Sequence, residues 1–126
     1  MREITLTDAE WSVMECLWDK SPRTGREVVN CLKEKTGWSR STILTLLGRL
    51  QEKGAVKADD EGTVKQFYPI ITREEAAGQQ TESLLERAYK GSLSMLVSNL
   101  TKRQKLSKQD VEELYAILDG LEDHHD

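Results

Sequence analysis

Several features that would place a chain in a common functional class are missing from these 126 residues. No apolar run reaches the roughly 18 residues of a membrane-spanning helix, so we expect no membrane association. The segment before Asp8 has neither the basic nor the apolar stretch of a secretory signal, and we expect a cytoplasmic protein. His124 and His125 are adjacent at the chain end, where we expect a surface tail rather than a metal site.

Catalytic motifs are missing as well. The sequence has no Ser/His/Asp set, no glycine-rich loop between a strand and a helix, and no HExxH pattern, so we expect neither an enzyme nor a cofactor. The two cysteines, Cys16 and Cys31, show no CxxC or Cys/His ligand spacing. We expect two small thiols on the core side of helices, with a redox pair or a metal site as the alternatives.

The formal net charge of −4 argues against a protein that coats nucleic acid without specificity. The charge is unevenly distributed. Residues 1–71 carry eleven basic and eleven acidic side chains, whereas residues 72–126 carry seven basic and eleven acidic ones. Because a DNA-binding protein can be acidic overall when its contact face is basic, the first half remains a candidate for binding DNA.

Three short helices are predicted in the first half. Thr7 and Thr24 each begin a Thr-x-x-Glu pattern, which is typical of a capping box at a helix start. Ser39 is suited to cap the third helix, and Gly54 to end it in the left-handed conformation. The hydrophobic period then changes from 3.6 to 2, which predicts strands at 55–58 and 63–70 around a turn at 59–62. Three helices followed by a hairpin are the order of a winged helix-turn-helix domain.

The remainder of the chain reads as helical throughout. Thr72 begins another capping pattern, and we expect helices at 72–89 and 92–102 and a last helix that begins at Ser107. The predicted fold is therefore mostly α: a winged helix-turn-helix domain at 1–71, followed by a helical dimerisation domain at 72–126.

The third helix carries the strongest functional signal. A helical wheel places four apolar residues on the core face, at positions 43, 46, 47 and 50. The opposite face is short and polar, with Ser41, Thr45, Gly48 and Glu52. Small hydroxyl side chains let a helix approach base edges closely, and Leu44 beside them could meet a thymine methyl. An ordinary solvated face is the alternative.

Basic residues around this face suit phosphates. The predicted DNA-contacting residues are Arg40, Ser41, Thr42, Leu44, Thr45, Arg49, Lys53 and Lys65. The acidic turn at 59–61 repels phosphate, so we expect the tip of the hairpin to stay off the DNA.

The last helix has a narrow apolar stripe with a 3-4-3 spacing that suits helix–helix association. Packing onto the chain's own first domain is the alternative. A symmetric dimer would match a palindromic operator. The predicted dimerisation residues are Leu93, Leu96, Val97, Leu100, Val111, Leu114, Tyr115, Leu118 and Leu121.

Several segments resemble the penicillinase repressor family, the BlaI/MecI/CopY group, over nearly the whole chain. These are LTDAEW at 6–11, TGREV at 24–28, STILTLLGRL at 41–50 and FYPI at 67–70. The resemblance implies a winged-helix homodimer that represses β-lactam resistance or copper genes at dyad operators, often with TACA and TGTA half-sites. It implies DNA contacts from Ser41, Thr42, Thr45 and Arg49.

The resemblance also bears on how repression would be relieved. In β-lactam-responsive members a sensor-linked protease system triggers cleavage of an Asn–Phe bond in the dimerisation region. Asn99–Leu100 occupies the matching place here, with Leu instead of Phe. Copper-responsive members of the best-known type end in Cys-x-Cys motifs, and no cysteine follows Cys31. An interaction module without DNA binding, or an activator, are the alternative functions.

Overall fold

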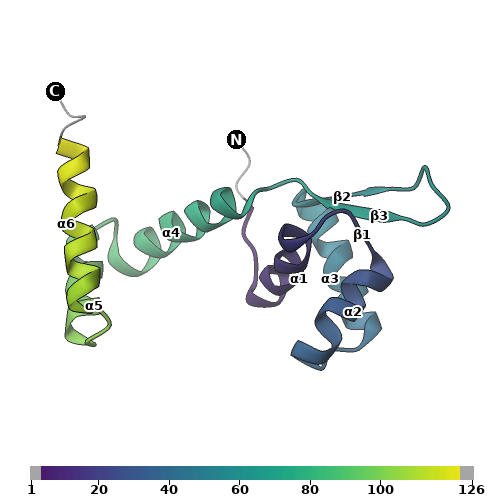
Figure 1. Cartoon of the computed structure of the whole chain (residues 1–126), viewed down its shortest axis with the longest axis horizontal. Helices are drawn as coiled ribbons and strands as arrows, with labels where there is room; N and C mark the ends of the chain where they lie inside the picture. Colours follow the sequence, from purple (N-terminus) through teal and green to yellow (C-terminus); the bar gives the residue numbers. More distant parts are fainter. Residues whose placement is uncertain (1–3, 123–126) are drawn as a thin grey trace. The chain divides into compact units, whose positions relative to one another are not determined.

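A computed structural model describes residues 4–122. The elements follow the order expected for a winged helix with a helical extension (Figure 1). They are α1 (Asp8–Asp19), β1 (Arg23–Thr24), α2 (Gly25–Thr36), α3 (Arg40–Lys53), β2 (Val56–Asp59), β3 (Gln66–Pro69), α4 (Arg73–Tyr89), α5 (Leu93–Lys102) and α6 (Lys108–Glu122).

Side-chain caps begin the first three helices, as the sequence predicts. Thr7 and Thr24 accept hydrogen bonds from the backbone N–H of the glutamate three residues later, and that glutamate accepts one from the threonine N–H. Ser39 caps α3 by accepting from the N–H of Thr42 at 3.2 Å. Gly54 ends α3 with φ at 82°, a left-handed conformation that favours glycine.

The hairpin formed by β2 and β3 is joined by a third strand that the sequence analysis did not predict. β1 pairs antiparallel with β3, so the strand order is β1-β3-β2. Arg23 lies opposite Phe67, and Ala58 lies opposite Phe67 on the other side. The wing is thereby attached to the segment between α1 and α2.

The core of the first domain lies among α1, α2, α3 and the sheet. The predicted core face of α3 is confirmed, since Ile43, Leu46, Leu47 and Leu50 are all buried. α1 contributes Val13, Met14 and Leu17, α2 contributes Val28, Val29 and Leu32, and the sheet contributes Val56 and Phe67. Each fully buried side chain of this kind stabilises the fold by about 1.5–3 kcal/mol relative to exposure.

The chain divides into two compact units within α4, one ending at Thr81 and the other beginning at Glu82. The first unit therefore extends beyond the boundary expected at Thr72. Ala76 is part of its core, and Gln79 and Gln80 reach back to the N-terminal segment. Gln79 Oε1 accepts from the N–H of Ile4 at 3.0 Å, and Gln80 Nε2 donates to the carbonyl of Leu6 at 3.1 Å.

The second unit has a different character. None of its described residues is buried, although this unit carries most of the exposed large apolar side chains of the described chain.

Within residues 4–122, none of the helices is both long and apolar enough to cross a membrane.

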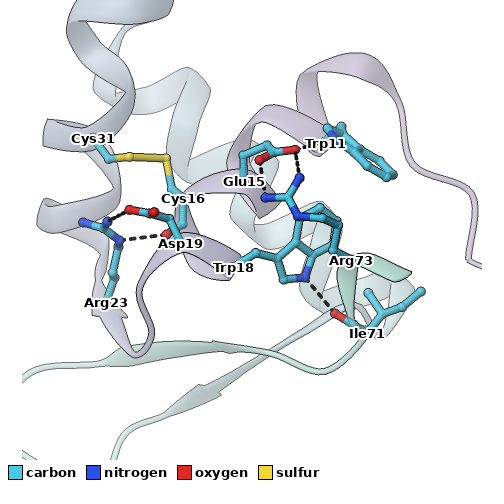
Figure 2. A network of polar contacts seen from close by, with 9 residues as sticks. All are labelled: Trp11, Glu15, Cys16, Trp18, Asp19, Arg23, Cys31, Ile71 and Arg73. Carbon is cyan, nitrogen blue, oxygen red and sulfur yellow. Dashed lines mark hydrogen bonds and ion pairs between the residues drawn. A yellow bond between two sulfur atoms is a disulfide. The ribbon is translucent and has the colours of Figure 1, made fainter. Parts of the chain in front are cut away.

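The two cysteines differ from the expectation of separate thiols. Cys16 on α1 and Cys31 on α2 form a disulfide, with their Cα atoms 6.4 Å apart (Figure 2). Each cysteine lies on the expected inner side of its helix, but the spacing along the sequence does not reveal that these two helix faces meet.

Candidate nucleic-acid interface

The outward face of α3 is open to solvent. Ser41, Thr42, Thr45 and Arg49 are exposed and, with the edge of Leu46, line a shallow hollow on the surface. The residues on the opposite side of the same helix fill the core. A rigid helix therefore presents short polar side chains outward, as a base-reading helix requires.

Local hydrogen bonds determine what these hydroxyls can still offer. The hydroxyl of Thr45 donates to the backbone carbonyl of Ser41 at 2.8 Å. Its oxygen keeps acceptor capacity, and its methyl group is free. Thr45 is therefore suited to accept from the exocyclic amine of adenine or cytosine rather than to donate to a base.

A groove of about 390 Å³ lies beside this face. Its walls come from the start of α2, the middle of α3 and the wing, and three basic side chains lie along it: Arg26, Arg40 and Lys65. Leu44 also lines the groove and is 36% exposed. Its Cδ2 lies 3.3 Å from where a Cβ on Gly25 would be, so a glycine there allows the start of α2 to approach α3.

Arg26 was missing from the predicted interface. It lies in the first turn of α2 directly after a helix cap, and the N-terminus of a helix favours anions. The Thr-x-x-Glu pattern at Thr24 marks this helix start in the sequence. Arg26 lies two residues after Thr24, so the pattern could have predicted that Arg26 lies at an anion-binding helix end.

Lys65 stands on the wing as predicted. Its ammonium lies 3.8 Å from a carboxylate oxygen of Asp60 at the wing tip, and both side chains are more than half exposed. An exposed ion pair of this kind contributes little to stability, so Lys65 can exchange it for a phosphate. The acidic tip lies next to Lys65 and would repel the backbone of DNA.

Lys53 makes contacts within the protein that the sequence did not predict. Its ammonium donates to the backbone carbonyl of Thr5 at 2.7 Å and to Oε1 of Glu10 at 2.6 Å. Glu10 is buried, with 1% of its surface exposed. Burial alone would raise the pKa of Glu10, but hydrogen bonds from Lys53 and Thr7 outweigh it and hold the pKa below its usual value. Lys53 thus neutralises a buried carboxylate, and its predicted phosphate contact stays a prediction.

A second network fixes the beginning of α4 to α1 (Figure 2). Arg73 donates to both carboxylate oxygens of Glu15, and its guanidinium lies 5.0 Å from the ring centroid of Trp18. The indole N–H of Trp18 in turn donates to the carbonyl of Ile71 at 2.9 Å. The hydrogen bonds from Arg73 hold the pKa of the Glu15 carboxyl below its usual value. This network explains why the first domain continues into α4.

The predicted dimerisation residues lie on two helices of the second unit. On α6 the stripe is exposed, from 38% at Leu114 to 66% at Tyr115. Ile117, 62% exposed, is a further apolar residue that the 3-4-3 pattern left out. On α5 Leu93 is exposed, whereas Leu96, Val97 and Leu100 are half-buried. Asn99 and Leu100 lie within α5, near its C-terminal end.

From Ile4 to Glu122 no group of three His, Cys, Asp or Glu side chains is arranged to hold an ion. His124 and His125 lie outside the described residues.

Known proteins are similar in sequence to this chain over most of its length. A family model described as penicillinase repressor matches residues 6–120. The penicillinase repressor of Bacillus licheniformis is 36% identical over 114 residues, which cover 90% of this chain and 89% of that protein. The methicillin resistance regulatory protein MecI of Mammaliicoccus sciuri is 28% identical over 113 residues, with 90% and 92% covered.

Two solved structures match the first domain. The solution structure of the DNA binding domain of the repressor BlaI is 37% identical, covers 60% of this chain and 93% of that one, and superimposes with a TM-score of 0.53. The monomeric form of Bacillus licheniformis BlaI, solved in complex with the blaP half-operator, is 36% identical, covers 58% and 89%, and gives a TM-score of 0.53. Because the family model spans almost every described residue and these two relatives are matched over about nine-tenths of both chains, this chain belongs to the penicillinase repressor family.

Proposed function

We propose that this chain is a transcriptional repressor that binds a palindromic DNA operator as a homodimer. The observation that carries the proposal is the open polar face of α3 beside a basic groove, on the domain that matches the DNA-binding domain of BlaI. In that relative the domain is bound to a half-operator, which supports the same use of α3 here.

Each group at this interface has a distinct task. Ser41, Thr42 and Thr45 face the base edges in the major groove, where their size permits a close approach. Arg40 and Arg49 neutralise phosphates at the two ends of the face. Arg26 and Lys65 extend these backbone contacts along the groove between α2 and the wing.

The second unit is suited to hold two copies together. Val111, Leu114, Leu118 and Leu121 are between 38% and 51% exposed on one side of α6, and the described part of this unit has no core of its own. Pairing with the same helix of a second copy would remove this apolar surface from water. Two linked reading helices then bind two half-sites with a raised effective concentration.

Proteolysis at Asn99–Leu100 is the proposed route of induction, for genes of the β-lactam resistance type. The carbonyls of both residues accept backbone hydrogen bonds, from Arg103 at 3.1 Å and Lys105 at 3.0 Å. A protease needs an extended substrate, so the end of α5 must open before cleavage. Cleavage would release α6 and leave the reading helix intact.

Operator binding by the full chain tests the proposal. The DNA is the palindromic sequence nearest the promoter upstream of the chain's own gene, and affinity is measured by fluorescence anisotropy over a series of salt concentrations. The logarithm of affinity should fall with a slope of about −0.9 for each neutralised phosphate. Arg49→Ala should weaken binding and flatten the slope, whereas Lys33→Ala on the outer side of α2 should change neither.

The same measurement separates the alternative function. A chain that binds no palindrome from its own promoter region would be an interaction module rather than a repressor. Operator affinity unchanged by both Thr45→Ala and Arg49→Ala would contradict the use of α3 to contact DNA.

A further inference from the structure

The disulfide between Cys16 and Cys31 encloses the part of the chain that holds one wall of the basic groove. The enclosed segment includes β1 and the start of α2. β1 pairs with β3 of the wing through Arg23 and Thr24, and Arg26 lines the groove opposite Lys65. A covalent bond on the far side of α2 therefore restricts the segment that positions the wing and Arg26.

Hydrogen bonds connect the disulfide to this segment. The guanidinium of Arg23 donates from Nε to the carbonyl of Cys16 at 2.9 Å and to the carbonyl of Lys20 at 3.1 Å. Arg23, which pairs with Phe67 of the wing, is thus held by the backbone of a bonded cysteine. The position of α1 at Cys16 and the position of β1 are coupled directly.

The sulfur pair is within reach of reagents. Cys31 is half-buried, and both cysteines line a surface groove of about 520 Å³. The same groove carries two carboxylates, Glu15 and Asp19, and two cations, Lys35 and Arg73, so the opening to the sulfur atoms is polar. A disulfide sealed in the core would lack this access.

We propose that Cys16–Cys31 is a redox-reversible site that tunes operator binding, with the disulfide form binding more tightly. The inference rests on the proposed function, because a regulator bound to DNA works in a reducing compartment where disulfides are usually transient. In the oxidised form the disulfide holds the wing and Arg26 in place.

The exchange step uses a dithiol as reductant. One thiolate of the dithiol attacks Cys31, the more exposed cysteine, and the Cys16–Cys31 bond breaks as a mixed disulfide forms. The second thiol of the dithiol then displaces Cys31. Two electrons and two protons end on the two cysteines, and the dithiol becomes a cyclic disulfide. Oxidised glutathione re-forms the Cys16–Cys31 bond: the two cysteines give up two electrons and two protons, and one glutathione disulfide becomes two molecules of reduced glutathione.

The test compares the full chain in oxidised and dithiothreitol-reduced form. Iodoacetamide labelling followed by mass spectrometry counts the thiols, and we expect none in the first form and two in the second. The reduced chain should unfold about 10 °C lower, as expected for opening a loop of this size. Its operator affinity should fall about tenfold, since a loosened contact surface binds less well. Amide hydrogen exchange should speed up at residues 20–27 and 64–69.

Cys16→Ala/Cys31→Ala serves as the matched control, because it removes the bond and keeps a small apolar side chain at each site. It should behave like the reduced chain and ignore both reagents. Equal operator affinity in the two redox forms would overturn the proposal, as would a pair that stays reduced in oxidised glutathione. Should neither form bind an operator, the proposed repressor function fails, while thiol counts and hydrogen exchange still report whether the bond forms and fixes the wing segment.

Discussion

The ammonium of Lys53 at the end of α3 lies 2.6 Å from Oε1 of Glu10 in the first turn of α1. The other oxygen of Glu10 is buried without a hydrogen-bond partner. A single lysine therefore provides the only positive charge that hydrogen-bonds this carboxylate within the described residues. The pair joins the end of α3 to the beginning of α1.

Replacing this lysine should destabilise the domain more than replacing an exposed one. We expect Lys53→Met to lower the free energy of unfolding by about 2–3 kcal/mol, because it leaves a buried charge unpaired. Lys33→Met, on the exposed side of α2, should change it by less than about 0.5 kcal/mol. Urea denaturation measures both. Adding Glu10→Gln to Lys53→Met should restore part of the loss, and equal effects of the two lysine variants would contradict the assigned role.

The low pKa of Glu10 predicts how stability depends on pH. Because the folded pKa lies below the unfolded value of about 4.3, the contribution of Glu10 is present above that value. It is lost as the pH falls through the folded pKa. We expect Glu10→Gln to be less stable than the parent chain near pH 7, with the difference shrinking below pH 4. Thermal unfolding followed across this range would show parallel curves if Glu10 did not contribute.

The two halves of the Thr45 side chain can be tested separately. Thr45→Val keeps the methyl group and removes the acceptor oxygen, whereas Thr45→Ser does the reverse. We expect Thr45→Val to relax base preference at one position of each half-site by about 1 kcal/mol and Thr45→Ser to retain it. Affinities for a set of singly substituted operators measure this. A uniform loss over all operators would make Thr45 a positioning residue.

The apolar stripe of α6 should control operator affinity without touching DNA. Leu114→Glu/Leu118→Glu places charges on this stripe and should convert the dimer to a monomer in sedimentation. Affinity for the full operator should fall by about a hundredfold or more, while affinity for a single half-site stays unchanged. A chain truncated after Asn99 should behave in the same way. Full operator affinity in either variant would contradict dimerisation through α6.

The sequence predicted local features well because their causes are local. The caps at Thr7, Thr24 and Ser39 and the left-handed Gly54 depend on residues within one turn, and all four are confirmed. The open face of α3 follows from helical period alone. The structure shows that this face is exposed, whereas its contacts with DNA stay a prediction.

Features that depend on distant partners could not be predicted in the same way. β1 has only two residues and exists because β3 lies beside it. The contact between Lys53 and Glu10 could not be predicted, because a helical wheel of α3 shows only neighbours within that helix and Glu10 lies 43 residues earlier. The bond between Cys16 and Cys31 depends in the same way on how two helices pack.

Gly48 lies on the half-buried side of α3, in the wall of the basic groove, and no atom beyond its chain neighbours and the adjacent backbone of its own helix lies within 4 Å of where its Cβ would be. Nothing in the free protein requires a glycine at this place, and alanine there should raise the free energy of unfolding by about 0.5–1 kcal/mol. If the space is reserved for the sugar–phosphate wall of the duplex, Gly48→Ala will melt later and bind its operator less tightly. The melting temperature of this variant would then rise while its operator affinity falls. A screen for thermal stability alone would therefore select variants that bind the operator weakly.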